Sequence, residues 1–164
     1  AHCPASNMKL SSGVARIPEM LKLGIPVGLA VDGSASNDGS SLLEEMRIGF
    51  LLHRLTSGDK APTGYDMLKI ATRGSAKLLG RTDIGQLAVG KAGDFFAVRE
   101  DRLEFAGATG DVSAMLATVG IKAPVDYTVV AGKVLVREGN LRGIDEGRLV
   151  DQVTRHADHM RNFI

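Results

Sequence analysis

The sequence has little of three features that mark particular classes of protein. It contains one cysteine in 164 residues, so it cannot form an internal disulfide and it suits a reducing compartment. Its formal net charge is +1, and no basic stretch points to a nucleic-acid surface. No apolar run approaches the roughly 20 residues that a membrane-spanning helix needs. We therefore expect a soluble, cytoplasmic protein that binds neither nucleic acid nor membrane.

What the chain does have is enough apolar residues for a core and a strand-like run that ends in an acid. Hydrophobic residues make up 44% of the sequence, and no internal repeat is present. Residues 27–31 are apolar without alternation, which is typical of a strand covered on both faces, as in a parallel sheet flanked by helices. Asp32 follows at the carboxyl end, where α/β folds bind ligands. Asp before Gly also often opens a turn, and this stretch alone supports both readings equally.

The remaining elements are predicted from capping residues and periodicity. Ser41 and Glu44 form a capping-box pattern that opens a helix to about residue 55. The predicted buried side of this helix consists of Leu42, Leu43, Met46, Phe50 and Leu51. The other predicted helices are a short one within 11–24, one from Thr63 or Asp66 to Gly80 interrupted at 74–75, one over 113–119 capped by Asp111, and a closing one from Asp145. Short strands are predicted at 26–31, 95–98, 127–130 and 134–136, the last two forming a hairpin.

Two segments carry motifs that point to a known family. Residues 2–7 read His-Cys-Pro-Ala-Ser-Asn, and residues 32–37 read Asp-Gly-Ser-Ala-Ser-Asn. At this spacing the pair resembles the segments after the seventh and eighth barrel strands of the amidohydrolase superfamily, in the branch of hydrolytic deaminases and chlorohydrolases. Residues 84–94 resemble that branch's return from the barrel to a side β-domain. Residues 102–108 are most similar to 8-oxoguanine deaminases.

The resemblance implies an α/β fold and a chain that is the C-terminal part of a larger polypeptide. Residues 1–83 would hold the end of strand seven, strand eight and the following helices of a TIM-like (β/α)8 metal-dependent hydrolase barrel. Residues 84–143 would form the C-terminal part of a small β-sandwich domain, and residues 144–164 a closing helix. The remaining N-terminal barrel strands of the same protein would be its structural partners, and we expect a homo-oligomer.

The resemblance also implies metal-dependent hydrolysis. The family uses one divalent metal, zinc first and iron second, which lowers the pKa of a bound water from 15.7 to about 7. Asp32 matches the family aspartate that binds this metal and takes the proton of that water, so it is the predicted catalytic residue and metal ligand. The water would attack a ring carbon that bears an exocyclic amine, and ammonia would leave. The other metal ligands of the family are histidines on earlier strands, which this chain does not contain.

The expected substrate is a small heterocycle, an amino-substituted purine or pterin such as 8-oxoguanine. His2, Ser36 and Asn37 are the predicted substrate-binding residues. His2 has the alternative of a structural hydrogen bond to the neighbouring loop, and Ser36 and Asn37 could instead orient Asp32 or bond to turn backbone. Two other functions stay open, a chlorohydrolase or aminohydrolase of triazines and a non-catalytic scaffold that binds no metal.

Four further residues are of metal-binding type but are assigned structural roles. His53 lies on a predicted outer helix, where we expect surface or core rather than a ligand. His156 and His159 are one turn apart, as metal pairs can be, but an Arg- and Asp-rich helix favours a solvated face. Cys3 has no evident base nearby and is predicted to be a small buried residue.

Overall fold

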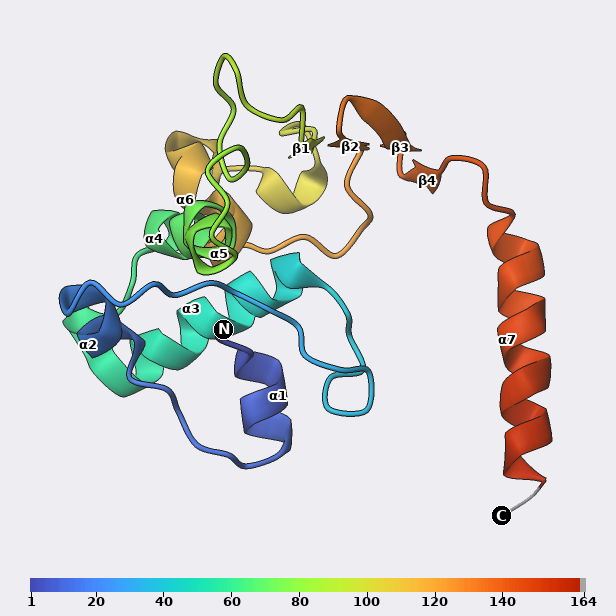
Figure 1. The fold of residues 1–164 in the computed structure, drawn as a ribbon, viewed down its shortest axis with the longest axis horizontal. Helices are drawn as coiled ribbons and strands as arrows, with labels where there is room; N and C mark the ends of the chain where they lie inside the picture. The colour runs from blue at the N-terminus through green and yellow to red at the C-terminus, as the bar shows by residue number, and fades with distance from the viewer. Residues whose placement is uncertain (163–164) are drawn as a thin grey trace.

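The computed structural model describes residues 1–162. Helices fill the first half of the chain, and a small sheet and a final helix follow (Figure 1). The helices are α1 (Pro4–Lys9), α2 (Ile17–Lys22), α3 (Leu42–Ser57), α4 (Gly64–Lys69), α5 (Ser75–Leu78), α6 (Val112–Thr118) and α7 (Glu146–Arg161). The strands are β1 (Phe95–Ala97), β2 (Tyr127–Val130), β3 (Lys133–Arg137) and β4 (Asn140–Leu141), and the short turns of helix are η1 (Gly58–Lys60), η2 (Ile70–Gly74), η3 (Leu103–Phe105) and η4 (Thr109–Asp111). Within the described residues no helix has the length and apolarity to cross a membrane.

The helices begin where the capping residues predict. A side-chain oxygen accepts a hydrogen bond from the backbone N–H three residues further on at Ser41, Thr63, Asp111 and Asp145. At Thr63 the bond is reciprocal, because the carboxylate of Asp66 accepts from the N–H of Thr63. Each cap satisfies a backbone donor that has no partner inside its helix. α1 is a helix that the sequence did not predict.

The predicted strand at 26–31 is wrong as a strand. It forms a single parallel bridge between His2 and Leu29, in which the N–H of His2 donates to the carbonyl of Gly28 at 2.8 Å. The N–H of Ala30 donates to the carbonyl of His2 at 2.9 Å. The pairing does not continue past residue 3, because the segment that begins at His2 turns into α1 at Pro4. The ring of Pro4 also removes a backbone donor.

The apolar core lies between this segment and the helices. Its fully buried members come from α2, the 27–29 segment, α3, α4, η2 and α6: Ile17, Val27, Leu29, Met46, Met67, Ile70 and Ala117. The predicted inner side of α3 is therefore only partly correct. Met46 is 1% exposed, but Leu42 and Leu51 are 40% and 49% exposed.

The helix over 64–78 is continuous where the sequence predicts an interruption. Residues 70–74 form a π-helical turn, η2, and the backbone stays helical through Gly74 into α5. The turn carries Ser75 to the 27–31 segment, where its hydroxyl accepts from the N–H of Leu29 at 3.1 Å. A Cβ at position 74 would lie 2.1 Å from the carbonyl oxygen of Val27. Glycine at this position therefore allows the helix to lie directly against the segment that ends at Asp32.

Replacing Gly74 by alanine is expected to destabilise the protein. Alanine favours a helix by about 1 kcal/mol over glycine. The clash is with backbone, which cannot move aside as a side chain can, and overpacking costs about 1 to 3 kcal/mol and occasionally more. The unfolding midpoint of the full-length polypeptide in urea should fall. Gly110→Ala is the matched control, because a Cβ there meets open space. Equal midpoints in the two variants would contradict the close approach.

The second half of the chain builds one four-stranded antiparallel sheet in the order β1-β2-β3-β4. The predicted hairpin is confirmed, and its two-residue loop has positive φ at both Ala131 (49°) and Gly132 (75°), as a turn that matches strand twist requires. Within the described residues these strands form one sheet, and its place as the C-terminal part of a sandwich stays a prediction.

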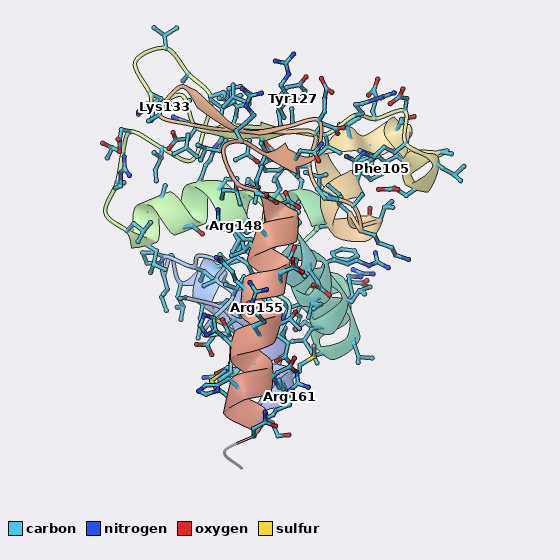
Figure 2. The ribbon with its side chains drawn as sticks, turned by 90° about the vertical axis from the view of Figure 1, so that its right-hand side faces the viewer. Phe105, Tyr127, Lys133, Arg148, Arg155 and Arg161 are labelled. Atoms are coloured by element: carbon cyan, nitrogen blue, oxygen red, sulfur yellow. The ribbon has the colours of Figure 1, made fainter. Side chains whose placement is uncertain are left out.

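The closing helix α7 begins at the predicted cap but packs against little. In Figure 1 it stands apart from the rest of the chain, and Figure 2 shows it with its side chains extending from all round the helix. It has no buried residue. Its predicted apolar stripe is exposed at Leu149 (47%), Val153 (58%) and Met160 (64%).

Candidate functional site

Asp32 lies in an exposed position directly after the 27–31 segment, with a donor on each carboxylate oxygen. The hydroxyl of Ser6, on α1, donates to Oδ2 at 2.5 Å, and the N–H of Gly33 donates to Oδ1 at 2.8 Å. Ser6 itself is 2% exposed. The two sequence motifs therefore meet at this carboxylate: Ser6 belongs to residues 2–7, and Asp32 and Gly33 belong to residues 32–37. Each oxygen keeps a lone pair for another ligand.

The surroundings of Asp32 favour its ionised form. The hydrogen bond from Ser6 lowers the pKa of this carboxyl group most, followed by that from the N–H of Gly33. The backbone of Asp32 has φ of +67°, in the left-handed region. Such a conformation costs a residue with a Cβ roughly 1 kcal/mol or more, and it persists only when neighbouring contacts hold it. Strained residues of this kind cluster at functional sites.

Asn37 and Ser36 lie behind Asp32 in the same loop. Asn37 is 7% exposed, and its amide donates to the carbonyl of Val31 at 2.8 Å, while its oxygen accepts from the N–H of Gly39 at 3.0 Å. The side chain of Asn37 is thus hydrogen-bonded within the protein, which agrees with the alternative that it bonds to the backbone of its own turn. Ser36 is half-buried, and its hydroxyl contributes least among the groups that lower the pKa of Asp32.

Glu45 of α3, which the sequence analysis missed, is hydrogen-bonded to both motifs. Its carboxyl group accepts from the N–H of Ala5 at 3.0 Å and from the amide of Asn37 at 2.6 Å, and it is 1% exposed. The signal for it was present. Glu45, Gly49 and His53 are spaced four apart, so they form one helical row beside the apolar side of α3. Because this row lies next to the apolar side, the pattern predicts that Glu45 and His53 are buried and hydrogen-bonded.

His2 and His53 form a buried pair. Their Nε2 atoms are 3.0 Å apart, and the two side chains are 3% and 0% exposed. His53 is thus a core residue rather than a surface one, one of the two positions expected for it. For His2 the arrangement agrees with the structural alternative, although the partner is a helix and not the neighbouring loop. Burial lowers the pKa of both rings most, and the nearby His53 and the amine of Ala1 also lower the pKa of His2, to about 4.

Acid is expected to destabilise the fold through His2. Between pH 6.5 and about 4 the unfolded chain binds a proton that the folded chain excludes, so the unfolding free energy should fall as pH falls through this window. The contribution of His2 is at most about 3 kcal/mol. Urea unfolding of the full-length polypeptide at a series of pH values measures it. His2→Gln should weaken the dependence and leave the part due to His53, whereas His156→Gln, on exposed α7, should leave it unchanged. The same slope in all three proteins would contradict the assignment.

The donor groups of this chain fit one ligand of a metal site, not a whole one. Asp32 offers an ionised, accessible carboxylate, which suits zinc as one of its usual four ligands. In residues 1–162 no three His, Cys, Asp or Glu side chains are placed to hold a metal ion, and this includes the histidines of α7. Cys3 is half-buried rather than buried, and desolvation raises its pKa, as expected of an unreactive thiol.

The comparison with protein families agrees with this geometry. Residues 1–135, which contain both motifs and most of the sheet, match the amidohydrolase family. The chain belongs to the amidohydrolase family. Its fold is mixed α/β and is similar to solved structures of zinc-containing hydrolases.

This amidohydrolase chain has relatives with several substrates. It is 46% identical over 163 residues to hydroxydechloroatrazine ethylaminohydrolase of Pseudomonas sp. (strain ADP), and the match covers 96% of this chain and 34% of the relative. It is 44% identical to 8-oxoguanine deaminase of Pseudomonas aeruginosa, with 91% and 33% covered. The chain thus spans about a third of the length of these relatives.

Solved structures give the same result. Atrazine chlorohydrolase TrzN from Arthrobacter aurescens TC1, complexed with zinc, has a TM-score of 0.88 and 36% identity, over 94% of this chain and 34% of that one. An adenosine deaminase from Xanthomonas campestris with bound zinc has a TM-score of 0.89 and 29% identity, over 98% and 37%.

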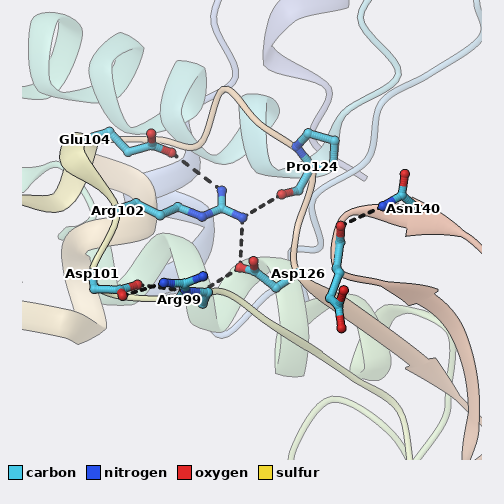
Figure 3. A network of polar contacts seen from close by, with 8 residues as sticks. Arg99, Asp101, Arg102, Glu104, Pro124, Asp126 and Asn140 are labelled. Atoms are coloured by element: carbon cyan, nitrogen blue, oxygen red, sulfur yellow. Dashed lines mark hydrogen bonds and ion pairs between the residues drawn. The ribbon is translucent and has the colours of Figure 1, made fainter.

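Residues 102–108, for which the sequence predicts a similarity to 8-oxoguanine deaminases, make structural contacts beside the sheet. Arg102 forms an ion pair with Asp126 at 2.8 Å and donates to the carbonyl of Pro124 (Figure 3). Phe105 is fully buried. In Figure 1 this segment, next to the sheet, is separated from the loop that follows Asp32. The described contacts of Arg102 therefore hold this segment to residues 124–126.

Proposed function

We propose that this chain is the C-terminal part of a zinc-dependent hydrolytic deaminase that acts on an amino-substituted ring of the purine or pterin type. The observation that carries the proposal is Asp32, an ionised carboxylate presented at the end of a segment paired in parallel with the other family motif. Zinc is supported by the zinc-containing structures that this fold resembles. The remaining ligands would come from barrel strands of the same protein outside these residues.

The residues of this chain would take the following parts in the reaction. A bound divalent metal supplies the acidity that makes a nucleophilic water available near pH 7. The Asp32 carboxylate would bind the metal and accept the proton of that water as its oxygen forms a bond to the ring carbon. The same proton, passed to the exocyclic nitrogen, would let the carbon–nitrogen bond break and ammonia leave.

Of the three residues predicted to bind substrate, we retain Ser36. It is half-buried in the loop that follows Asp32, and its side chain interacts with the Asp32 carboxylate, which supports a place for Ser36 beside the proposed site. Asn37 and His2 instead support the site, because their polar atoms face Val31, Glu45 and His53. We therefore propose Ser36 as a substrate-binding residue and the other two as support.

A second candidate function is hydrolysis of a substituted triazine. It is favoured by the 46% identity to an ethylaminohydrolase of a hydroxylated triazine, which is close to the identity with 8-oxoguanine deaminase. Asp32 would have the same role in both reactions, since only the leaving group and ring differ.

Ammonia release from 8-oxoguanine is the expected outcome of a substrate panel. The full-length zinc-loaded polypeptide would be given 8-oxoguanine, guanine, isoxanthopterin, adenosine analogues and substituted triazines, and ammonia, alkylamine and chloride would be measured. Release of alkylamine or chloride alone would establish the second candidate. Metal analysis of the same preparation distinguishes zinc from iron, and a preparation that binds neither and turns over nothing would point to a non-catalytic scaffold.

A further inference from the structure

Glu45 is a buried acid whose position has a cost. Its side chain is 1% exposed, and within residues 1–162 it forms no ion pair. Burying a carboxyl group is unfavourable unless its oxygens are hydrogen-bonded. Glu45 meets that requirement with one donor from each family motif, Ala5 from residues 2–7 and Asn37 from residues 32–37.

The first of these bonds holds α1. This helix has Pro4 in its first turn and Cys3 at its N-cap, and Cys3 makes no side-chain cap hydrogen bond. Glu45 supplies the missing acceptor from α3, at 3.0 Å from the N–H of Ala5. The next residue, Ser6, is the one whose hydroxyl donates to Oδ2 of Asp32 at 2.5 Å. Glu45 thus fixes the turn that presents Ser6 to Asp32.

The second bond holds the loop after Asp32. The amide of Asn37 is shared between Glu45 at 2.6 Å and the carbonyl of Val31 at 2.8 Å. Val31 directly precedes Asp32, so this amide ties the backbone on the amino side of Asp32 to α3. The loop held in this way includes the left-handed backbone of Asp32, with φ of +67°.

Both bonds act on the same residue, one through its side chain and one through its backbone. We propose that Glu45 is a positioning residue that sets the orientation of the Asp32 carboxylate through Ser6 and Asn37. This inference rests on the proposed role of Asp32 as metal ligand and proton acceptor. Residues that support a ligand in this indirect way typically change metal affinity or activity by 10- to 100-fold when altered.

The test uses Glu45→Gln in the full-length polypeptide. Glutamine keeps the size but turns one acceptor into a donor, which faces either the N–H of Ala5 or the amide of Asn37. The half-time of zinc loss to a chelator should shorten about tenfold, and kcat should fall by about 10- to 100-fold with KM changed little. Glu44→Gln is the matched control, because Glu44 is the exposed neighbour on the same helix. It should behave as the wild type in both measurements.

A second variant keeps the proposal testable if Glu45→Gln does not fold. Ser6→Ala leaves Glu45 in place and removes only the last hydrogen bond to Asp32, and it should show the same faster zinc loss and the same split between kcat and KM. Wild-type zinc retention in Ser6→Ala and in any folded Glu45→Gln would overturn the positioning role. If Asp32→Asn impairs zinc binding while these variants do not, this inference alone fails. If Asp32→Asn also has no effect, the proposed function fails with it.

Discussion

Replacing Asp32 by asparagine is expected to lower kcat by about 10²- to 10⁴-fold while the fold survives. Asparagine has the same shape, and its side-chain oxygen can still accept from the hydroxyl of Ser6. What it loses is the negative charge that binds a metal and the basicity that takes a proton. Turnover in the full-length polypeptide and zinc content per chain measure the two losses separately, and circular dichroism checks the fold.

The control for this variant is Asp38→Asn in the same loop. Asp38 is an exposed acid that forms an ion pair with Lys9 at 2.7 Å, and exposed pairs of this kind contribute little to stability. Its replacement should leave zinc content and kcat close to the wild type. Near-normal turnover in Asp32→Asn would end the assignment of Asp32, and an equal loss in both variants would show that charge in the loop, not Asp32 itself, is what counts.

The features that the sequence predicts correctly depend on a few neighbouring residues. The caps at Ser41, Thr63 and Asp111 need only a side-chain oxygen and a backbone donor three positions along, so they can be predicted without knowing the rest of the fold. The hairpin at Ala131-Gly132 is likewise local. The two family motifs lie far apart in the sequence, and the hydrogen bond from Ser6 to Asp32 brings them together, while the role of Asp32 stays a prediction.

The features that the sequence does not predict depend on contacts between distant segments. The 27–31 run is apolar enough for a buried strand, but a strand also requires a partner, and the one beside it turns into α1 after three residues. Glu45 reads as a second acid next to Glu44, and only its place in a row with Gly49 and His53 hints that it is buried. Gly74 reads as a helix breaker, whereas its lack of a Cβ is what lets two elements touch.

Residues 1–164 expressed alone are expected to aggregate or to stay molten and to bind zinc only weakly. Large apolar side chains are open to solvent on several elements, including Leu55 (85%), Leu79 (69%) and Leu103 (91%), in addition to the stripe on α7. Soluble monomers rarely expose continuous apolar patches above a few hundred Å². In the proposed architecture these surfaces pack against the rest of the polypeptide, because this chain matches only 34% of the length of each of these relatives.

Size-exclusion chromatography, urea unfolding and equilibrium zinc binding of residues 1–164, each compared with the full-length polypeptide, measure this expectation. The isolated residues should elute near the void volume or unfold without a cooperative transition, because the exposed apolar surface finds no fixed partner. Zinc binding should be weaker by orders of magnitude, since a single carboxylate cannot complete a site of about four ligands. A monomer that unfolds cooperatively and binds one zinc per chain would contradict this expectation. It would show that the chain forms its own core and its own metal site, whereas we propose that Asp32 is only one of several metal ligands.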